Sequence, residues 1–245
     1  MKNIHSCTLI IAFIVMMSTG LVSCSSDNDT TNSENTNAIS AKLVTTLPGN
    51  DANPYDEVGW LYNELFDTYY TNANLGGTVP QIIIKVQTIA DASASFNSIK
   101  GSPYHNVSST RVHYLLEHPT NCVNDVISAS SMSTTGKSSL TNFINSFIIF
   151  LENENDCDVI YDKVVSYENG VLLNSSLTEN DKCIIFTTTS VARHSAYRAR
   201  KKPKKNTDPD WTVLIGNIIS STEGAEYGSA EAATMSLVTG IAQND

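Results

Sequence analysis

Basic residues are scarce in this chain, in which 15 Lys and Arg stand against 25 Asp and Glu. The formal net charge of −10 removes any general attraction to nucleic acid or to anionic head groups, so no nucleic-acid partner is expected. Long apolar runs are also missing. The run from Leu9 to Met17 is too short to cross about 30 Å of hydrocarbon, so it does not predict a membrane-spanning helix.

Cysteine is sparse too, and none of the five cysteines forms a Cys-x-x-Cys pair, so zinc-ligand spacing is absent. His113 and His118 lie five positions apart, which rotates them by roughly 140° on a helix. They do not share a face as a His-Glu-x-x-His site requires, and we predict no metal and no cofactor. Cys122, Cys157 and Cys183 allow at most one disulfide in an exported chain, and the sequence leaves open whether one forms.

The first 24 residues have the layout of an exported precursor. Lys2 supplies a positive charge, the apolar run follows, and the segment ends in Leu-Val-Ser-Cys at Cys24. This ending resembles the lipobox of bacterial lipoproteins. The resemblance implies that residues 1–23 are a signal peptide, and that Cys24 becomes the acylated first residue and the membrane anchor. The mature chain would then carry 14 basic and 25 acidic residues, a net charge of −11.

Residues 24–42 are predicted to form a disordered tether. From 25 to 42, 13 of 18 residues are Ser, Thr, Asn or Asp, which leaves too little apolar surface to offset chain entropy. The acid-rich start after Cys24 is similar to the signal that exports lipoproteins of the Bacteroidota to the outer face of the outer membrane. Asp29-Thr30-Thr31 is similar to the O-glycosylation acceptor of that phylum, with Thr30 as the site. The resemblance implies an outer-membrane lipoprotein and leaves its inner or outer face open.

Residues 43–245 are predicted to fold as one α-helical, bundle-like globular domain. Apolar residues recur mainly at spacings of three and four, and alternating hairpin pairs are absent. Asn53 with Pro54, and the Ser-, Thr- and acid-rich segment 176–181, are typical of helix starts. Residues 82–86 favour a strand by propensity, but the surrounding spacing favours a helix. Helices are expected near 54–72, 81–96, 109–117, 122–130, 139–151, 157–173, 179–200, 211–219 and 229–242.

Two glycine-containing segments match functional motifs only in part. Residues 131–138 end in Gly-Lys-Ser like a P-loop, but Ser131 stands where the first glycine belongs. We therefore interpret this segment as a loop that caps the next helix. Gly224 and Gly228 have the spacing of a membrane-helix dimer motif, but glutamates interrupt the segment. We interpret it as close helix packing in a soluble core.

A basic segment is the one anomaly in the charge pattern, because six of the 14 mature basic residues fall within eight positions. One interpretation is a surface that binds anionic lipid, lipopolysaccharide or an acidic polymer. The other is the cationic last turn of a helix that runs into an exposed loop. The candidate polyanion-binding residues are Arg198, Arg200, Lys201, Lys202, Lys204 and Lys205.

Two parts of the helical region look like segments of helical lipoproteins of the Bacteroidota. They are residues 53–59 with Asn63, and residues 176–179 with 190–193 and 195–197. The resemblance supports a helical fold and an envelope location and names no activity and no site.

Two hypotheses for the function follow. The first is a non-enzymatic module, anchored to the membrane through Cys24, that binds an envelope protein or glycan. The alternative is a helical envelope hydrolase whose site is assembled only in three dimensions; a pocket that gathers His105, His113, His118 or His194 with carboxylates would favour it. Arg193, His194 and Ser195 are neighbours on a predicted helix, so we interpret them as helix surface. No catalytic residue is predicted.

Overall fold

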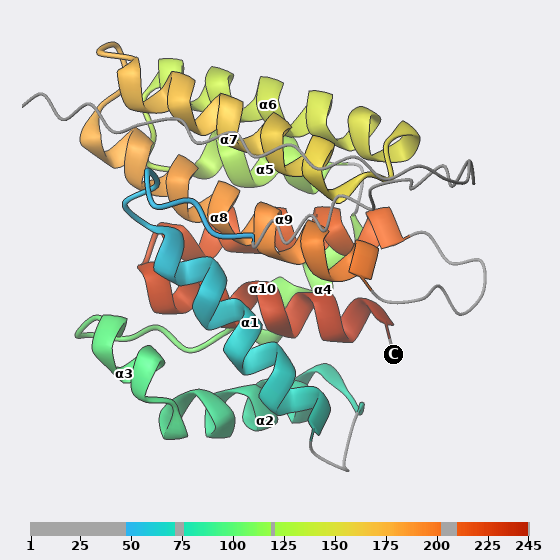
Figure 1. The fold of residues 1–245 in the computed structure, drawn as a ribbon. Coiled ribbons are helices and arrows are strands. Elements are labelled where there is room, and N and C mark those ends of the chain that lie inside the picture. Colours follow the sequence, from blue (N-terminus) through green and yellow to red (C-terminus); the bar gives the residue numbers. More distant parts are fainter. Residues whose placement is uncertain (1–47, 72–75, 119–120, 202–209, 245) are drawn as a thin grey trace, which may run out of the picture. The chain divides into compact units, whose positions relative to one another are not determined.

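The computed structural model describes residues 48–71, 76–118, 121–201 and 210–244. Within these ranges the chain forms ten α-helices and no β-strand, which confirms the all-α prediction (Figure 1). All ten lie in one compact unit, Leu43–Asp245. Their bounds are α1 Asp56–Thr71, α2 Val79–Ala92, α3 Ala94–Ile99, α4 Ser109–Glu117, α5 Cys122–Ala129, α6 Thr134–Asn153, α7 Cys157–Leu173, α8 Glu179–Lys201, α9 Asp210–Ala225 and α10 Ser229–Asn244.

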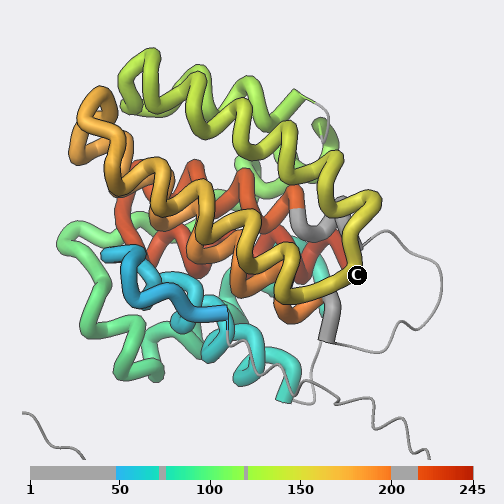
Figure 2. The backbone as a smooth tube through the Cα atoms, turned by 45° about the horizontal axis from the view of Figure 1, so that its top comes forward, coloured from blue at the N-terminus to red at the C-terminus, as the bar shows by residue number. Residues whose placement is uncertain are grey.

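Helices α8, α9 and α10 lie at the centre of this unit (Figure 2). Helix α10 packs against α1, α2, α8 and α9, and α8 packs against α1, α7 and α9. Every residue from Ala230 to Ile241 is buried. A helix that is buried all round is typical of the middle of a domain, and the many Ala, Ser and Thr residues of α10 allow its neighbours to come close.

Glycine brings α9 and α10 together. A Cβ at Gly224 would lie 2.6 Å from the Cα of Ala232, and a Cβ at Gly240 would lie 2.1 Å from Oδ1 of Asn217. A real side chain cannot approach other atoms so closely, so these helices could not pack at this distance without glycine. The predicted close packing around residues 224–228 is confirmed.

Side-chain caps set the starts of α6 and α8. The hydroxyl of Thr178 accepts from the N–H of Asp181 at 3.0 Å, and the Asp181 carboxylate accepts from the N–H of Thr178 at 2.8 Å. This capping box confirms the start signal in residues 176–181. Asp181 also accepts from the N–H and hydroxyl of Ser133, both at 2.7 Å, which joins the two helix starts. Burial raises the pKa of Asp181, but these hydrogen bonds prevail and lower it.

The P-loop-like segment is the start of a helix. Gly136 lies within α6, and its N–H donates to the hydroxyl of Ser133 at 3.1 Å. A Cβ at Gly136 would lie 2.3 Å from Oδ1 of Asp181, so this glycine serves the approach of α6 to α8. The predicted cap is confirmed at Ser133, but the predicted loop is too long, because residues 134–138 already belong to α6.

Several predicted helix boundaries differ from the structure: α6 begins five residues before the predicted 139, and α9 continues six residues beyond the predicted 219. Helix α1 begins at Asp56, two residues after Pro54, because Asn53 Oδ1 accepts from the N–H of Tyr55 at 2.8 Å and holds a turn. The helix expected over 81–96 is divided into α2 and α3 at Ser93, whose hydroxyl accepts from the N–H of Phe96 at 3.0 Å. Residues 82–86 are helical, as the apolar spacing indicated.

No helix in the part of the chain that the structure describes is long and apolar enough to span a membrane. Cys122, Cys157 and Cys183 are not joined by disulfides. Burial raises the pKa of the Cys122 thiol, which makes it a poor nucleophile.

Candidate functional site

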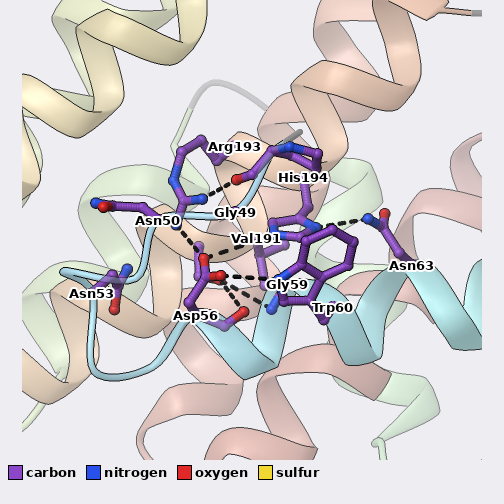
Figure 3. A network of polar contacts seen from close by, with 12 residues as sticks. Gly49, Asn50, Asn53, Asp56, Gly59, Trp60, Asn63, Val191, Arg193 and His194 are labelled. Carbon is purple, nitrogen blue, oxygen red and sulfur yellow. Dashed lines mark hydrogen bonds and ion pairs between the residues drawn. The ribbon is translucent and has the colours of Figure 1, made fainter. Parts of the chain in front are cut away.

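A buried ion-pair network joins α7 and α8 to the segment that leads into α1. Figure 3 shows its Arg193, Asp56 and His194 side. Arg193 of α8 and Glu168 of α7 each have only 1% of the side chain exposed. Arg193 Nη2 lies 3.3 Å from Glu168 Oε1 and 2.6 Å from Asp56 Oδ1. Arg193 Nη1 donates to the carbonyl of Pro48. One guanidinium therefore links two carboxylates and a backbone carbonyl.

Two asparagines complete the hydrogen bonds of Glu168. Asn50 Nδ2 donates to Glu168 Oε2 at 2.7 Å, and Asn53 Nδ2 donates to Glu168 Oε1 at 2.7 Å. A buried charge is tolerated only where it is paired and hydrogen-bonded, and here both carboxylate oxygens have donors. The network therefore fixes residues 48–56 against α7 and α8 and leaves neither carboxylate oxygen of Glu168 without a donor.

His194 extends the network on the other side of Asp56. Its Nδ1 lies 2.6 Å from Nδ2 of Asn63, and Oδ1 of that asparagine accepts from Nε of Arg198. The amide nitrogen of Asn63 is thus the donor, so Nδ1 accepts and the proton of the neutral ring is on Nε2. That nitrogen faces Asp56 Oδ1 at 3.8 Å. Trp60 packs edge-on against the ring, with ring centroids 4.7 Å apart (Figure 3).

Burial and neighbouring charges determine the protonation states of Asp56 and His194. Burial lowers the pKa of His194 below its usual range, Asp56 opposes this effect, and the positive charge of Arg193 adds to it. Burial raises the pKa of Asp56, but the interactions with His194 and Arg193 prevail and lower it. The stable arrangement is an ionised Asp56 beside a neutral His194.

The interpretation of Arg193, His194 and Ser195 as helix surface was wrong. All three are buried, because α8 is covered by α1, α7, α9 and α10 and has no exposed face at this level. Residues 53–63 and 190–197, which are far apart in the sequence, meet here: the N–H of Gly59 donates to the hydroxyl of Ser190 at 3.0 Å. Both segments contain several polar residues, and this was the one sequence signal that could have suggested that they contact each other.

A second polar group lines an open cleft of about 360 Å³ between α4, the end of α9 and the start of α10. The segment 105–108 forms one wall, and residues 223–235 supply the opposite wall. This volume is within the range of small-molecule sites, at its lower end. The lining residues are His105, Asn106, Val107, Ser108, Arg111, Glu223, Gly224, Tyr227, Glu231 and Met235.

Glu231 is the most deeply placed charged residue of the cleft, with 2% of the residue exposed. Its Oε1 accepts from the backbone N–H of His105 at 2.9 Å and lies 3.7 Å from Nδ1 of the same ring. Its Oε2 is buried without a hydrogen-bond partner among the described residues. At the mouth, the rings of His105 and Tyr227 contact each other, with centroids 4.8 Å apart.

Arg111 and Glu223 form an ion pair on the same cleft. Arg111 Nε lies 2.6 and 2.7 Å from the two carboxylate oxygens of Glu223. Burial raises the pKa of Glu223, and Arg111 opposes that rise. Because this pair is internally neutral, Glu231 gives the cleft its net negative charge.

The cleft is relevant to the hydrolase hypothesis, since it holds His105 with carboxylates. A nucleophile is not aligned with this histidine: the hydroxyl of Ser108, which lines the cleft, accepts from the N–H of Arg111 at 3.3 Å and caps α4. His113 and His118 lie outside the cleft, each exposed and hydrogen-bonded through Nδ1 to the carbonyl four residues earlier. Among the described residues, no three His, Cys, Asp or Glu side chains gather as metal ligands.

The remaining candidate residues fall partly outside the described structure. Arg198 pairs with Asp67, with Nη2 to Oδ2 at 2.5 Å, and contacts Asn63. The side chains of Arg200 and Lys201 are not described, and Lys202, Lys204 and Lys205 lie outside the described residues, as do Cys24 and Thr30. Polyanion binding, lipidation and glycosylation therefore stay predictions.

No protein-family model, curated protein or solved structure matches the chain. The cleft and the buried network must therefore be interpreted from their own geometry.

Proposed function

We propose that the protein is a lipid-anchored envelope lipoprotein whose helical body binds a small polar molecule in the cleft between α4, α9 and α10. The observation that carries the binding function is the buried Glu231 in an open cleft, with one carboxylate oxygen that has no hydrogen-bond partner among the described residues. Buried polar atoms are normally satisfied, and an exception inside a concave site is a candidate ligand contact.

The network around Arg193 differs from the cleft, because among the described residues its unpartnered buried atoms are nitrogens of Arg193 and His194 and its carboxylates all have donors. Its carboxylates receive donors from the protein itself, and His194 is fully buried. Such a network stabilises the fold. The cleft instead combines an unsatisfied acceptor with two half-exposed rings, those of His105 and Tyr227, which a ligand can contact.

Hydrolysis in the same cleft is the second candidate function. The observation that favours it is His105 Nδ1 at 3.7 Å from Glu231, an arrangement in which the carboxylate could orient the imidazole as a base. Binding is the better proposal, because the serine hydroxyl of the cleft, on Ser108, already caps α4.

A fragment screen by ¹H–¹⁵N NMR tests the binding function. The chain from residue 24 onward, with Cys24→Ser to prevent acylation, is titrated with a mixed set of cationic, anionic and neutral fragments. We expect shifts of the amide signals of residues 105–111 and 223–235. Asn106→Trp, which places a large ring at the rim, should remove these shifts, whereas Asn124→Trp on the exposed face of α5 should retain them.

The proposed binding function fails if no fragment shifts signals from the cleft. The hydrolase alternative would gain support if ester, amide or glycoside fragments were consumed by the wild-type chain and remained intact with His105→Ala.

A further inference from the structure

The unsatisfied carboxylate oxygen in the cleft calls for a donor. Oε1 of Glu231 has the N–H of His105, while Oε2 is buried and has no partner among the described residues. A buried carboxylate oxygen without a donor is costly, so a bound group with N–H or O–H donors would be stabilised there.

Gly228 packs directly against one side of that oxygen. A Cβ at Gly228 would lie 2.7 Å from Oε2, closer than real side chains come. Gly228 also has φ of +157°, a conformation that other residues rarely adopt. The turn between α9 and α10 thus closes this side of the carboxylate, and a ligand must reach Oε2 from another side.

The charge of the cleft favours a cationic hydrogen-bond donor over a neutral one. Arg111 and Glu223 neutralise each other, so the remaining charge of the cleft is the single negative charge of Glu231. A cation compensates a buried carboxylate better than a neutral hydroxyl does. Because three acidic, His or Cys ligands do not converge in the described part of the chain, the cleft does not supply the ligand set that a metal ion takes.

The mouth of the cleft suits an organic cation. Tyr227 is 56% exposed, the His105 side chain is 50% exposed, and ammonium groups are attracted to aromatic faces such as that of tyrosine. Val107 and Met235 supply apolar lining for the group that carries the charge. Oε2 itself is buried, so the ligand reaches it only when the half-exposed rings of His105 and Tyr227 turn aside.

We propose that the cleft binds a protonated primary amine, whose N–H groups donate to Glu231 and whose apolar part packs against Tyr227, Val107 and Met235. This inference rests on the proposed binding function and names its ligand class. A primary ammonium supplies both the charge and the hydrogen-bond donors that the site lacks.

Three probes of similar shape separate the effect of the positive charge from the effect of the hydrogen-bond donors. Cyclohexylammonium carries charge and N–H donors, cyclohexyltrimethylammonium carries charge without N–H donors, and cyclohexanol has a donor without charge. We expect cyclohexylammonium to bind at least tenfold more tightly than either of the others, measured by NMR titration of the same chain. Equal binding of all three probes would overturn the proposal.

Glu231→Gln retains an acceptor for the His105 N–H and removes the charge. We expect it to weaken cyclohexylammonium binding at least tenfold, whereas Glu117→Gln, at an exposed position of α4 outside the cleft, should leave binding unchanged. Tyr227→Ala, at an exposed position, should weaken binding severalfold without loss of folding. Wild-type affinity in both cleft variants would contradict the proposal.

The two proposals can fail separately. If other fragments bind at the cleft and cyclohexylammonium does not, the amine class is wrong and the binding function stands. If no fragment of any class binds there, the binding function itself is wrong.

Discussion

Arg193 is charged and His194 is neutral, although they are neighbours in one buried helix. Arg193 remains charged because Asp56 and Glu168 surround its guanidinium. His194 is kept neutral because burial and Arg193 both lower its pKa. Sequence position indicated neither state, since the ion pairs of Arg193 and the burial of His194 depend on residues more than 20 positions away.

Removal of the Arg193 charge should be strongly destabilising. Arg193→Met leaves Glu168 buried without its cation, and breaking a buried pair in this way typically costs about 3–5 kcal/mol. The free energy of unfolding in urea measures the loss.

Lys100→Met is the control, because Lys100 and its partner Asp91 are both partly exposed and lie outside the buried network. Exposed ion pairs contribute about 1 kcal/mol or less. Equal losses in the two variants would contradict the structural role of Arg193.

His194 should make stability depend on pH. Its pKa is lower in the folded chain than in the unfolded chain, where a histidine titrates near about 6.5. Below that pH the unfolded state binds the extra proton, so the stability contributed by neutral His194 is lost as the pH falls from 7 to 5. The slope from one such group is at most about 1.4 kcal/mol per pH unit.

His194→Gln should reduce this slope, as measured by urea unfolding at a series of pH values. Glu223 acts with the opposite sign, because its raised pKa makes stability fall as pH rises through the acidic range. Both proteins contain Glu223, so the difference between them isolates His194. An unchanged slope would show that the ring does not titrate on unfolding in this window.

At the scale of helices, local sequence signals predicted where most helices lie along the chain but not which helices contact each other. Helices α4 and α7 match the predicted ranges because apolar spacing and caps lie within each segment. The break at Ser93 was missed, since a serine inside an apolar pattern becomes a cap only when the chain turns there. The approach of α1 to α8 at Gly59 depends on both helices and could not be predicted from either.

Gly59→Ala should separate α1 from α8. The added Cβ would lie 2.2 Å from Cδ2 of His194 and 2.6 Å from Oγ of Ser190, so we expect a loss of about 1–3 kcal/mol. Thermal unfolding measures the effect.

Gly170→Ala is the control for the same substitution. No atom lies within 4 Å of a Cβ at that position in α7, so the higher helix propensity of alanine should stabilise by about 0.5–1 kcal/mol. A loss at Gly170, or none at Gly59, would contradict the packing of these helices.

For the whole molecule, the proposed lipid anchor would determine the location, and the proposed cleft would recognise the ligand. Two or three acyl chains hold a protein stably at a membrane without basic residues, which agrees with the net negative charge of the chain. With the anchor as the attachment to the membrane, the role that the proposal leaves to the helical domain is to present the cleft to its ligand.

Cys24→Ser tests the anchor. We expect loss of labelling by an alkynyl palmitate and loss of processing or of membrane association, because serine offers no thiol for acylation. Cys122→Ser, whose thiol is buried in the folded domain, is the control and should retain labelling. Persistent labelling of Cys24→Ser would overturn the assignment.

The sequence by itself determined the all-α class and the approximate positions of the helices, because apolar periodicity and capping act within a few residues. It also indicated the lipobox, which stays a prediction. Only the tertiary structure decided that Arg193 and His194 are buried and that His105 lies beside Glu231, 126 positions away. Burial and pairing depend on which helices pack together, and a local pattern does not contain that information.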